Sequence, residues 1–128
     1  MDKDISVLIV EDDINICFLI ELVLKDFKIL SLSVGSLKMA QEELEVHVPT
    51  LIFLDNSLPD GKGVDFIKFI VVNYPCVKIV MCTAENLELL INEKEIFQYI
   101  QKPFAFEKIT NVIQELIKLP GCSKEKMS

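Results

Sequence analysis

The sequence of 128 residues contains no arginine and no tryptophan, and all 13 of its cationic side chains are lysines. With 20 acidic side chains, the formal net charge is −7. Arginine is the usual side chain for reading guanine edges and for binding a phosphate through two hydrogen bonds. An acidic chain without arginine is therefore a poor candidate for direct binding of nucleic acid.

Long hydrophobic runs are also missing. No stretch approaches the length of a transmembrane helix, and the N-terminus lacks the cationic start and the long apolar run of a signal peptide. We therefore expect no membrane insertion and a cytoplasmic location. The 51% hydrophobic and 26% charged residues exclude intrinsic disorder, and the length suits one domain.

The four cysteines show no CxxC spacing, and two of them, Cys17 and Cys82, lie in apolar runs. Disulfides are rare in the cytosol, and a zinc site needs closely spaced ligands. We therefore expect buried free thiols and neither a disulfide nor a zinc site.

Five short apolar runs alternate with five segments of helical periodicity. A short, β-branched and almost wholly apolar run is typical of a strand that is buried on both faces of a parallel sheet. The helical segments repeat their apolar residues at spacings of three and four. The expected strands are 5–10, a weaker 27–34, 50–54, 77–82 and 97–100, and the helical stripes run from Ile14 to Val23, Leu37 to Leu44, Val64 to Val71, Leu87 to Ile91 and Ile109 to Ile117.

This alternation predicts an α/β domain with helices on both faces of a parallel sheet. Right-handed crossovers and the domain size favour a doubly wound, flavodoxin-like (βα)5 fold with five strands in the order 2-1-3-4-5. The fourth helix is expected to be short or irregular. We assign residues 1–119 to the domain and 120–128 to a polar C-terminal tail, and we expect no effector domain after Leu119.

Polar side chains follow four of the predicted strands. Because the carboxyl ends of parallel strands meet at one edge of a sheet, we expect three carboxylates, one hydroxyl and one amine to converge. Carboxylates this close repel one another unless a cation intervenes, and Mg2+ (or Mn2+) suits oxygen ligands and a phosphate. Phosphoryl transfer to an aspartate uses this set of groups, namely a carboxylate nucleophile, a metal ion, a hydroxyl and an ammonium group. They are Glu11 and Asp12 after the first strand, Asp55 after the third, Thr83 after the fourth and Lys102 after the fifth.

The chain resembles the receiver domain of two-component response regulators, from about Ile5 to Leu119. Four pieces carry the resemblance, and each lies at the end of a predicted strand. One piece alone is a weak signal, but four in the same order are specific. The pieces are LIVEDD at 8–13, LDNSLPDGKG at 54–63, TA at 83–84 and YIQKPF at 99–104.

The resemblance implies that Asp55 is the phosphoacceptor and that a sensor histidine kinase or a phosphotransfer protein supplies the phosphoryl group. It implies that Asp12 binds Mg2+ directly, that Glu11 acts through water, and that the backbone carbonyl of Ser57 completes the protein's share of the coordination. The chain is then no enzyme in the usual sense, because it catalyses only its own phosphorylation and dephosphorylation.

The resemblance also assigns a switch. Thr83, followed by Ala84, would hydrogen-bond the phosphoryl group, and Lys102 would pair with its oxygens. Tyr99 occupies the position of the family's switch aromatic residue, and Pro103 that of a proline after a cis peptide bond. The switch would control an output protein that the sequence does not identify.

Two alternative functions stay open. A phosphatase of the haloacid dehalogenase type also uses Asp, Thr, Lys and Mg2+, but it needs a second acid two residues after the nucleophile, where this chain has Ser57. Its usual cap insertion does not fit in this length. The other alternative is a receiver-like interaction module that is not phosphorylated.

The interaction module stays open because the chain departs from the family between Thr83 and Lys102. Typical receivers have a longer fourth helix and a Gly-Ala turn in this part of the chain. Here the segment 92–98 contains neither glycine nor alanine. We therefore expect the surface formed by this helix, the fifth strand and the fifth helix to differ in shape from the family's usual output face.

Overall fold

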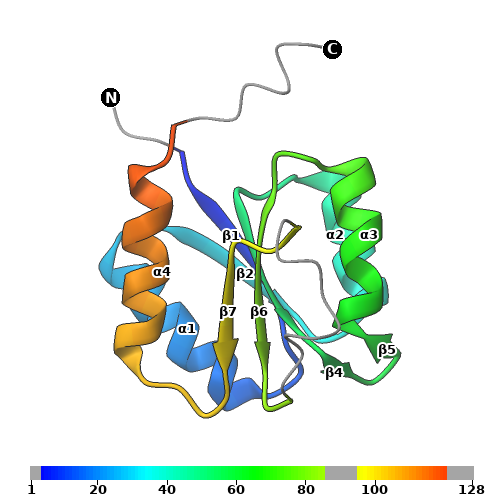
Figure 1. The fold of residues 1–128 in the computed structure, drawn as a ribbon, viewed down its shortest axis with the longest axis horizontal. Helices are drawn as coiled ribbons and strands as arrows, with labels where there is room; N and C mark the ends of the chain where they lie inside the picture. Colours follow the sequence, from blue (N-terminus) through cyan, green and yellow to red (C-terminus); the bar gives the residue numbers. More distant parts are fainter. Residues whose placement is uncertain (1–3, 86–94, 121–128) are drawn as a thin grey trace.

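The computed structural model describes residues 4–85 and 95–120 (Figure 1). Its elements in chain order are β1 (Ser6–Val10), α1 (Ile14–Asp26), β2 (Leu30–Val34), α2 (Leu37–Val46), β3 (Leu51–Asp55), β4 (Ser57–Leu58), β5 (Gly61–Lys62), α3 (Gly63–Asn73), β6 (Lys78–Thr83), β7 (Gln98–Gln101) and α4 (Phe106–Lys118). Five parallel strands form one sheet in the order β2-β1-β3-β6-β7, and β4 pairs with β5 in a small antiparallel hairpin. The predicted order 2-1-3-4-5 is confirmed, because β6 and β7 are the fourth and fifth strands of the sheet.

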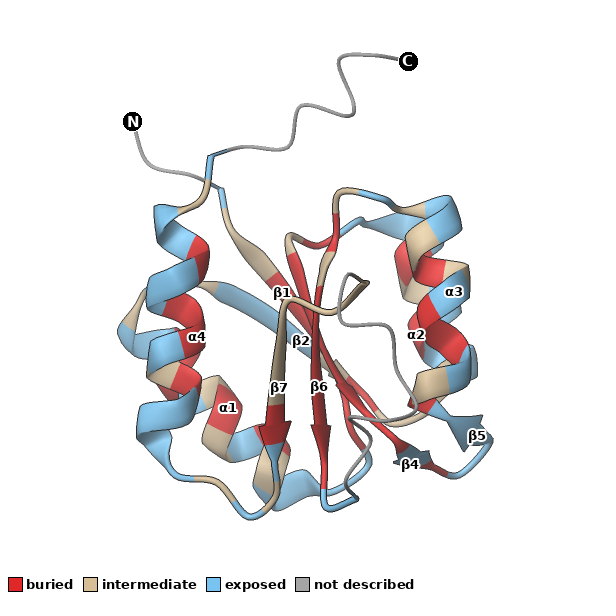
Figure 2. Cartoon of the chain, in the orientation of Figure 1, coloured by how far each residue is buried: buried red, intermediate tan, exposed pale blue. Residues whose placement is uncertain are grey.

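Helices cover both faces of the sheet, with α1 and α4 on one side and α2 and α3 on the other (Figure 1). Side chains alternate between the two faces of a strand. In β1, Val7 and Ile9 join the core on the side of α1 and α4, whereas Leu8 and Val10 join the core on the side of α2 and α3. The central strands are buried along their length (Figure 2), which explains why their sequences are apolar at almost every position.

The second strand is shorter than predicted, because it covers Leu30–Val34 and not 27–34. Helix α1 continues to Asp26 and uses Phe27 as its C-cap. Lys28 has a φ of 60°, which turns the chain toward β2. The strand lies at the edge of the sheet and is mostly exposed, so its apolar pattern is weak.

Two predicted segments lie outside the described residues, namely the fourth helix around Leu87 to Ile91 and most of the polar tail. The predicted difference in the output face depends on the first of them. The predicted fifth helix is α4 of the structure, and it begins at Phe106. Among the described residues, no helix is long and apolar enough to cross a bilayer.

The cysteines differ in part from the expectation. Cys17 and Cys82 are buried free thiols, and burial raises the pKa of both, which keeps them protonated. Cys76 is disulfide-bonded, so the expectation of a free thiol is wrong for this residue. A disulfide joins residues that are close in space, and spacing along the sequence does not reveal such a pair.

The β4–β5 hairpin is attached to the start of α2 by Asp60. The two carboxylate oxygens of Asp60 accept hydrogen bonds from the backbone N–H groups of Leu37 and Lys38, each at 2.9 Å. The hydroxyl of Ser36 accepts a third bond, from the N–H of Met39 at 3.1 Å. These bonds satisfy N–H groups that have no partner inside the helix. The backbone hydrogen bonds lower the pKa of Asp60.

Replacing Asp60 by Asn is expected to lower the melting temperature at neutral pH but not in acid. Because the pKa of Asp60 in the folded state lies below its ordinary value of 3.8, its carboxylate stabilises the fold above that pH. This stabilisation is lost as the pH falls through the lowered pKa. Thermal unfolding from about pH 3 to pH 7 should show the two melting curves converging below roughly pH 4. The control is Glu42→Gln, which removes an exposed carboxylate from α2. If the melting temperatures of Asp60→Asn and the wild type differed by the same amount at every pH, the assignment would be contradicted.

Candidate functional site

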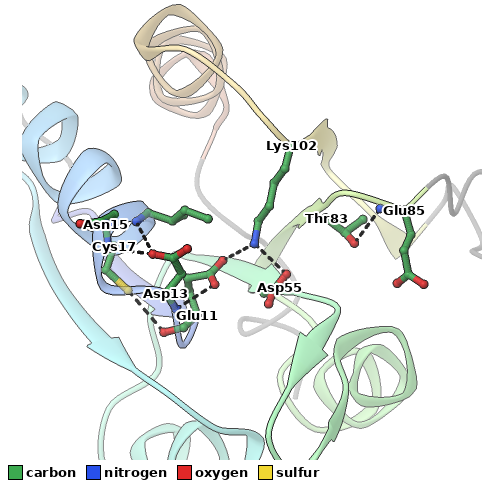
Figure 3. Close-up of polar contacts among 9 residues, drawn as sticks. Glu11, Asp13, Asn15, Cys17, Asp55, Thr83, Glu85 and Lys102 are labelled. Atoms are coloured by element: carbon green, nitrogen blue, oxygen red, sulfur yellow. Dashed lines mark hydrogen bonds and ion pairs between the residues drawn. The ribbon is translucent and has the colours of Figure 1, made fainter.

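Four strands bring polar side chains to one edge of the sheet. Asp55 ends β3 and Thr83 ends β6, while Glu11 directly follows β1 and Lys102 directly follows β7. These four strands are neighbours in the sheet, so the four side chains lie close together at its carboxyl edge (Figure 3). The convergence that the sequence predicts is therefore present.

Lys102 lies between two buried carboxylates. Its Nζ is 2.8 Å from Oε1 of Glu11 and 3.0 Å from Oδ1 of Asp55 (Figure 3). Both acidic residues are only 4% exposed. Hydrogen bonds between charged groups are stronger than those between neutral groups. The ammonium group thus holds the two carboxylates in a defined arrangement.

Burial and hydrogen bonding act against each other on these groups. Burial raises the pKa of Glu11, and hydrogen bonds from Lys102 and Asp13 offset this only in part. Burial alone would lower the pKa of Lys102, but its hydrogen bonds to Glu11 and Asp55 outweigh that effect and raise it. Lys102 is therefore fully protonated at neutral pH.

Glu11, Asp12 and Asp55 form an acidic cluster, with one carboxylate oxygen of each within 4.8 Å of the others. Asp12 is exposed, so solvent reaches the cluster from the side of Asp12. Three carboxylates against the single ammonium of Lys102 leave an excess of negative charge, which a divalent cation would offset. Oxygen donors of this kind fit Mg2+ or Mn2+. Ser57 follows as the first residue of β4, and the role of its carbonyl stays a prediction.

Asp13 shapes the loop between β1 and α1. Its carboxylate caps α1 by accepting a hydrogen bond from the N–H of Asn15 at 2.9 Å, and its own N–H donates to Oε2 of Glu11 at 3.1 Å (Figure 3). Asp13 therefore orients Glu11 and starts the helix.

The residues assigned to the switch lie beside this cluster. Thr83 is 2% exposed, and its Oγ1 accepts a hydrogen bond from the N–H of Glu85 at 3.2 Å (Figure 3). The hydroxyl of Tyr99 donates a hydrogen bond to the backbone carbonyl of Glu85. Ala84 follows β6 and is exposed. The Lys102–Pro103 peptide bond is cis, as the resemblance implies. The roles of these residues in binding and switching stay predictions.

Asn56 is a residue of the site to which the sequence assigns no role beyond a turn. It is 1% exposed, and its Oδ1 accepts a hydrogen bond from the N–H of Val64 at 3.0 Å. Its Nδ2 donates to Oε1 of Glu85 at 2.6 Å. Asparagine is common in turns. No local pattern therefore reveals that the side chain of Asn56 links α3 to the end of β6 through hydrogen bonds.

Gly63 allows the start of α3 to lie against the end of β3. A Cβ atom on Gly63 would lie 2.1 Å from the backbone oxygen of Asp55, far inside the contact distance. Its N–H donates to the carbonyl of Asn56 at 3.1 Å. Only glycine permits this approach, which places the start of α3 directly beside Asp55.

Comparison with known proteins agrees with this geometry. The family model for the response regulator receiver domain matches residues 7–114. The transcriptional regulatory protein CitB of Klebsiella pneumoniae is 33% identical over 85 residues, which make up 64% of this chain and 36% of that protein. The chain thus spans about a third of the length of this curated relative.

Solved structures show the same fold. The response regulator protein TrrA from Thermotoga maritima, solved in complex with Mg2+-BeF, has a TM-score of 0.79 at 20% identity, with 88% of this chain and 98% of that chain covered. The beryllofluoride-activated NtrC4 receiver domain dimer has a TM-score of 0.81 at 25% identity, with 88% of this chain and 96% of that chain covered. The first likeness concerns the fold alone.

Proposed function

Because the chain belongs to the response regulator receiver domain family of two-component systems, we propose that Asp55 accepts a phosphoryl group from a sensor histidine kinase or a phosphotransfer protein. The observation that supports this most directly is the contact of Lys102 with both Glu11 and Asp55 beside the exposed Asp12. This arrangement combines a nucleophile, an ammonium group and a cation-binding cluster at one edge of the sheet.

In the proposed reaction a carboxylate oxygen of Asp55 attacks phosphorus, and the bond from phosphorus to the imidazole nitrogen of the donor breaks. The electron pair of that bond stays on the imidazole, and the product on Asp55 is an acyl phosphate. Lys102 already holds Oδ1 of Asp55, so it orients the carboxylate and leaves the second oxygen for attack. Its ammonium group then pairs with the phosphoryl oxygens.

We propose that Asp12 and Asp55 hold Mg2+, with Glu11 acting through water and the carbonyl of Ser57 as a further ligand. When bound, the ion neutralises charge on the phosphoryl oxygens. Asp13 serves this site indirectly, because its N–H orients Glu11.

After transfer, the hydroxyl of Thr83, next to the small Ala84, donates a hydrogen bond to a phosphoryl oxygen. Tyr99 then moves into the space that Thr83 leaves. This biases an equilibrium between two conformations and so controls an output protein. The chain catalyses only its own phosphorylation and dephosphorylation. We place this activity in the cytoplasm.

The decisive test is incubation of the wild-type chain with acetyl phosphate, followed by measurement of the intact mass. We expect a gain of one phosphoryl group that requires Mg2+. A phosphatase would instead turn over a generic phosphate ester continuously without keeping the label. An interaction module would do neither, so an absent mass shift under these conditions would refute the proposed phosphorylation.

Replacing Lys102 by Met is expected to slow labelling by acetyl phosphate on the order of 100-fold, because the charge on the phosphoryl oxygens loses its partner. Methionine keeps much of the aliphatic length of lysine but carries no charge. The initial rate of the mass shift measures the effect. Lys108→Met, at an exposed position on α4, is the matched control and should label at the wild-type rate. Equal rates for both variants would remove Lys102 from the reaction.

A further inference from the structure

The β4–β5 hairpin carries Ser57, whose backbone carbonyl is one of the proposed ligands of Mg2+. The hairpin lies at the carboxyl end of the sheet (Figure 1). Ser57 pairs with Lys62 and Leu58 pairs with Gly61, so each strand has only two residues. So short a hairpin is not stable by itself. The position of the Ser57 carbonyl therefore depends on contacts between the hairpin and the rest of the chain.

Asp60, in the turn of this hairpin, makes such a contact. Its two carboxylate oxygens accept hydrogen bonds from the backbone N–H groups of Leu37 and Lys38, each at 2.9 Å. Hydrogen bonds to a charged acceptor are stronger than those between neutral groups. Both oxygens of Asp60 are thus directed at the start of α2, and Asp60 is not a member of the acidic cluster. Asp60 therefore attaches the hairpin to α2 and is not itself a candidate ligand of the cation.

The next residue of the hairpin touches the same helix. Gly61 has a φ of 153°, a conformation that side chains other than glycine rarely adopt. A Cβ atom on Gly61 would lie 3.0 Å from Cδ1 of Leu37, the first residue of α2. A polar and an apolar contact thus join the hairpin to one point of the fold.

The chain that leads into α2 is also attached to the loop of the acidic cluster. The N–H of Glu11 donates a hydrogen bond to the carbonyl of Val34, the last residue of β2, at 3.0 Å. A Cβ atom on Gly35 would lie 4.0 Å from Cα of Asp12, so the turn between β2 and α2 runs beside this loop. Helix α2 begins two residues later, at Leu37. The acidic loop and the hairpin are therefore connected through the turn before α2.

We propose that Asp60 is a positioning residue for the divalent cation, because its bonds to α2 hold the carbonyl of Ser57 in place relative to the acidic cluster. A metal binds most tightly when its ligands are already held in place by the groups around them. Without the bonds of Asp60, the hairpin is free to move relative to the acidic loop, and cation binding has to order it. The proposal rests on the proposed function, because it concerns the cation of the same site.

The test is the affinity of the whole chain for Mg2+ alone, measured by isothermal titration calorimetry. Asp60→Ala removes both bonds to α2 and should raise the dissociation constant about 10-fold, the lower end of the range for loss of a group that orients a metal ligand. Asp60→Asn keeps the shape and one acceptor oxygen, so it should weaken binding less. Because Mg2+ binds without a phosphoryl donor, this measurement is independent of labelling.

Two control variants separate positioning from loss of charge and from loss of stability. Asp65→Asn removes an exposed carboxylate from the first turn of α3, so the net charge changes by the same amount as in Asp60→Asn. Ser36→Ala removes the hydrogen bond from the N–H of Met39, which caps the same end of α2 without involving the hairpin. Ser36→Ala should lower the melting temperature, but both controls should bind Mg2+ with wild-type affinity.

The outcomes distinguish the positioning role from the proposed function. An Asp60→Ala variant that folds and binds Mg2+ as tightly as the wild type would overturn the positioning role alone. A control variant that loses as much affinity as Asp60→Ala would also overturn it, since charge or helix stability would then be the cause. A wild-type chain that binds no Mg2+ would overturn the proposed cation site and the positioning role with it.

Discussion

Replacing Asp55 by Asn is expected to abolish labelling by acetyl phosphate and Mg2+. The amide of asparagine is a poor nucleophile, but it has nearly the same shape as the carboxylate and still offers an oxygen to Nζ of Lys102. The fold should therefore persist. The melting temperature should stay the same or rise, because one of three clustered carboxylates is gone. Intact mass measured over time gives the labelling rate, and calorimetry gives the melting temperature.

The matched control for this variant is Asp65→Asn, which removes an exposed carboxylate from the first turn of α3. It changes the net charge by the same amount and should label at the wild-type rate. Labelling of Asp55→Asn at the wild-type rate would place the nucleophile elsewhere, with Asp12 the first candidate because it is in the same cluster. Loss of labelling in both variants would point to net charge as the cause.

Replacing Gly63 by Ala is expected to have the largest effect on stability. The new Cβ atom would lie 2.1 Å from the backbone oxygen of Asp55 and 2.9 Å from Cγ of Leu54. The first contact is with backbone, so no flexible side chain can give way. Helix α3 must therefore move away from β3, which also strains the hydrogen bond from Gly63 to the carbonyl of Asn56. We expect a loss of about 3 kcal/mol in the free energy of unfolding, measured by urea denaturation.

Gly35→Ala is a control of the same chemistry. A Cβ atom on Gly35 would meet its nearest neighbour, Cα of Asp12, at 4.0 Å, which is an ordinary contact. We expect this variant to change the free energy of unfolding by less than about 1 kcal/mol. Equal effects of the two substitutions would mean that the close approach of α3 to Asp55 is not what requires glycine at position 63.

The fold could be predicted from local patterns because both faces of the sheet are covered. A strand such as Leu51–Asp55 is buried at every position, so it is recognisable as a short, wholly apolar run. The prediction was least accurate at Leu30–Val34, where the strand lies at the edge and is mostly exposed. The sequence contains little hydrophobic signal there, and the turn at Lys28 depends on a single positive φ.

The candidate site could be located for a similar reason. Polar residues at the ends of apolar strands must meet at the carboxyl edge of a parallel sheet, and this places Asp55 and Lys102 together although they are 47 positions apart in the sequence. The cis peptide bond before Pro103 followed from the resemblance and is present. Asn56 could not be identified, because its partners Val64 and Glu85 come from two other parts of the chain.

The amino-acid pattern was thus enough to identify which strands are buried and at which edge the three carboxylates collect, whereas the strand order followed from the handedness of the crossovers and the fold that the domain size favours. Such information is local, because burial of a strand or a helix face leaves its mark on neighbouring residues. The bonds of Lys102 to Glu11 and Asp55, the close approach at Gly63 and the contact between Asn56 and Glu85 became known only from the folded chain. These contacts depend on strand register and on the packing of α3 against β3. A contact between residues that are distant in the sequence produces no periodic pattern from which it could be predicted.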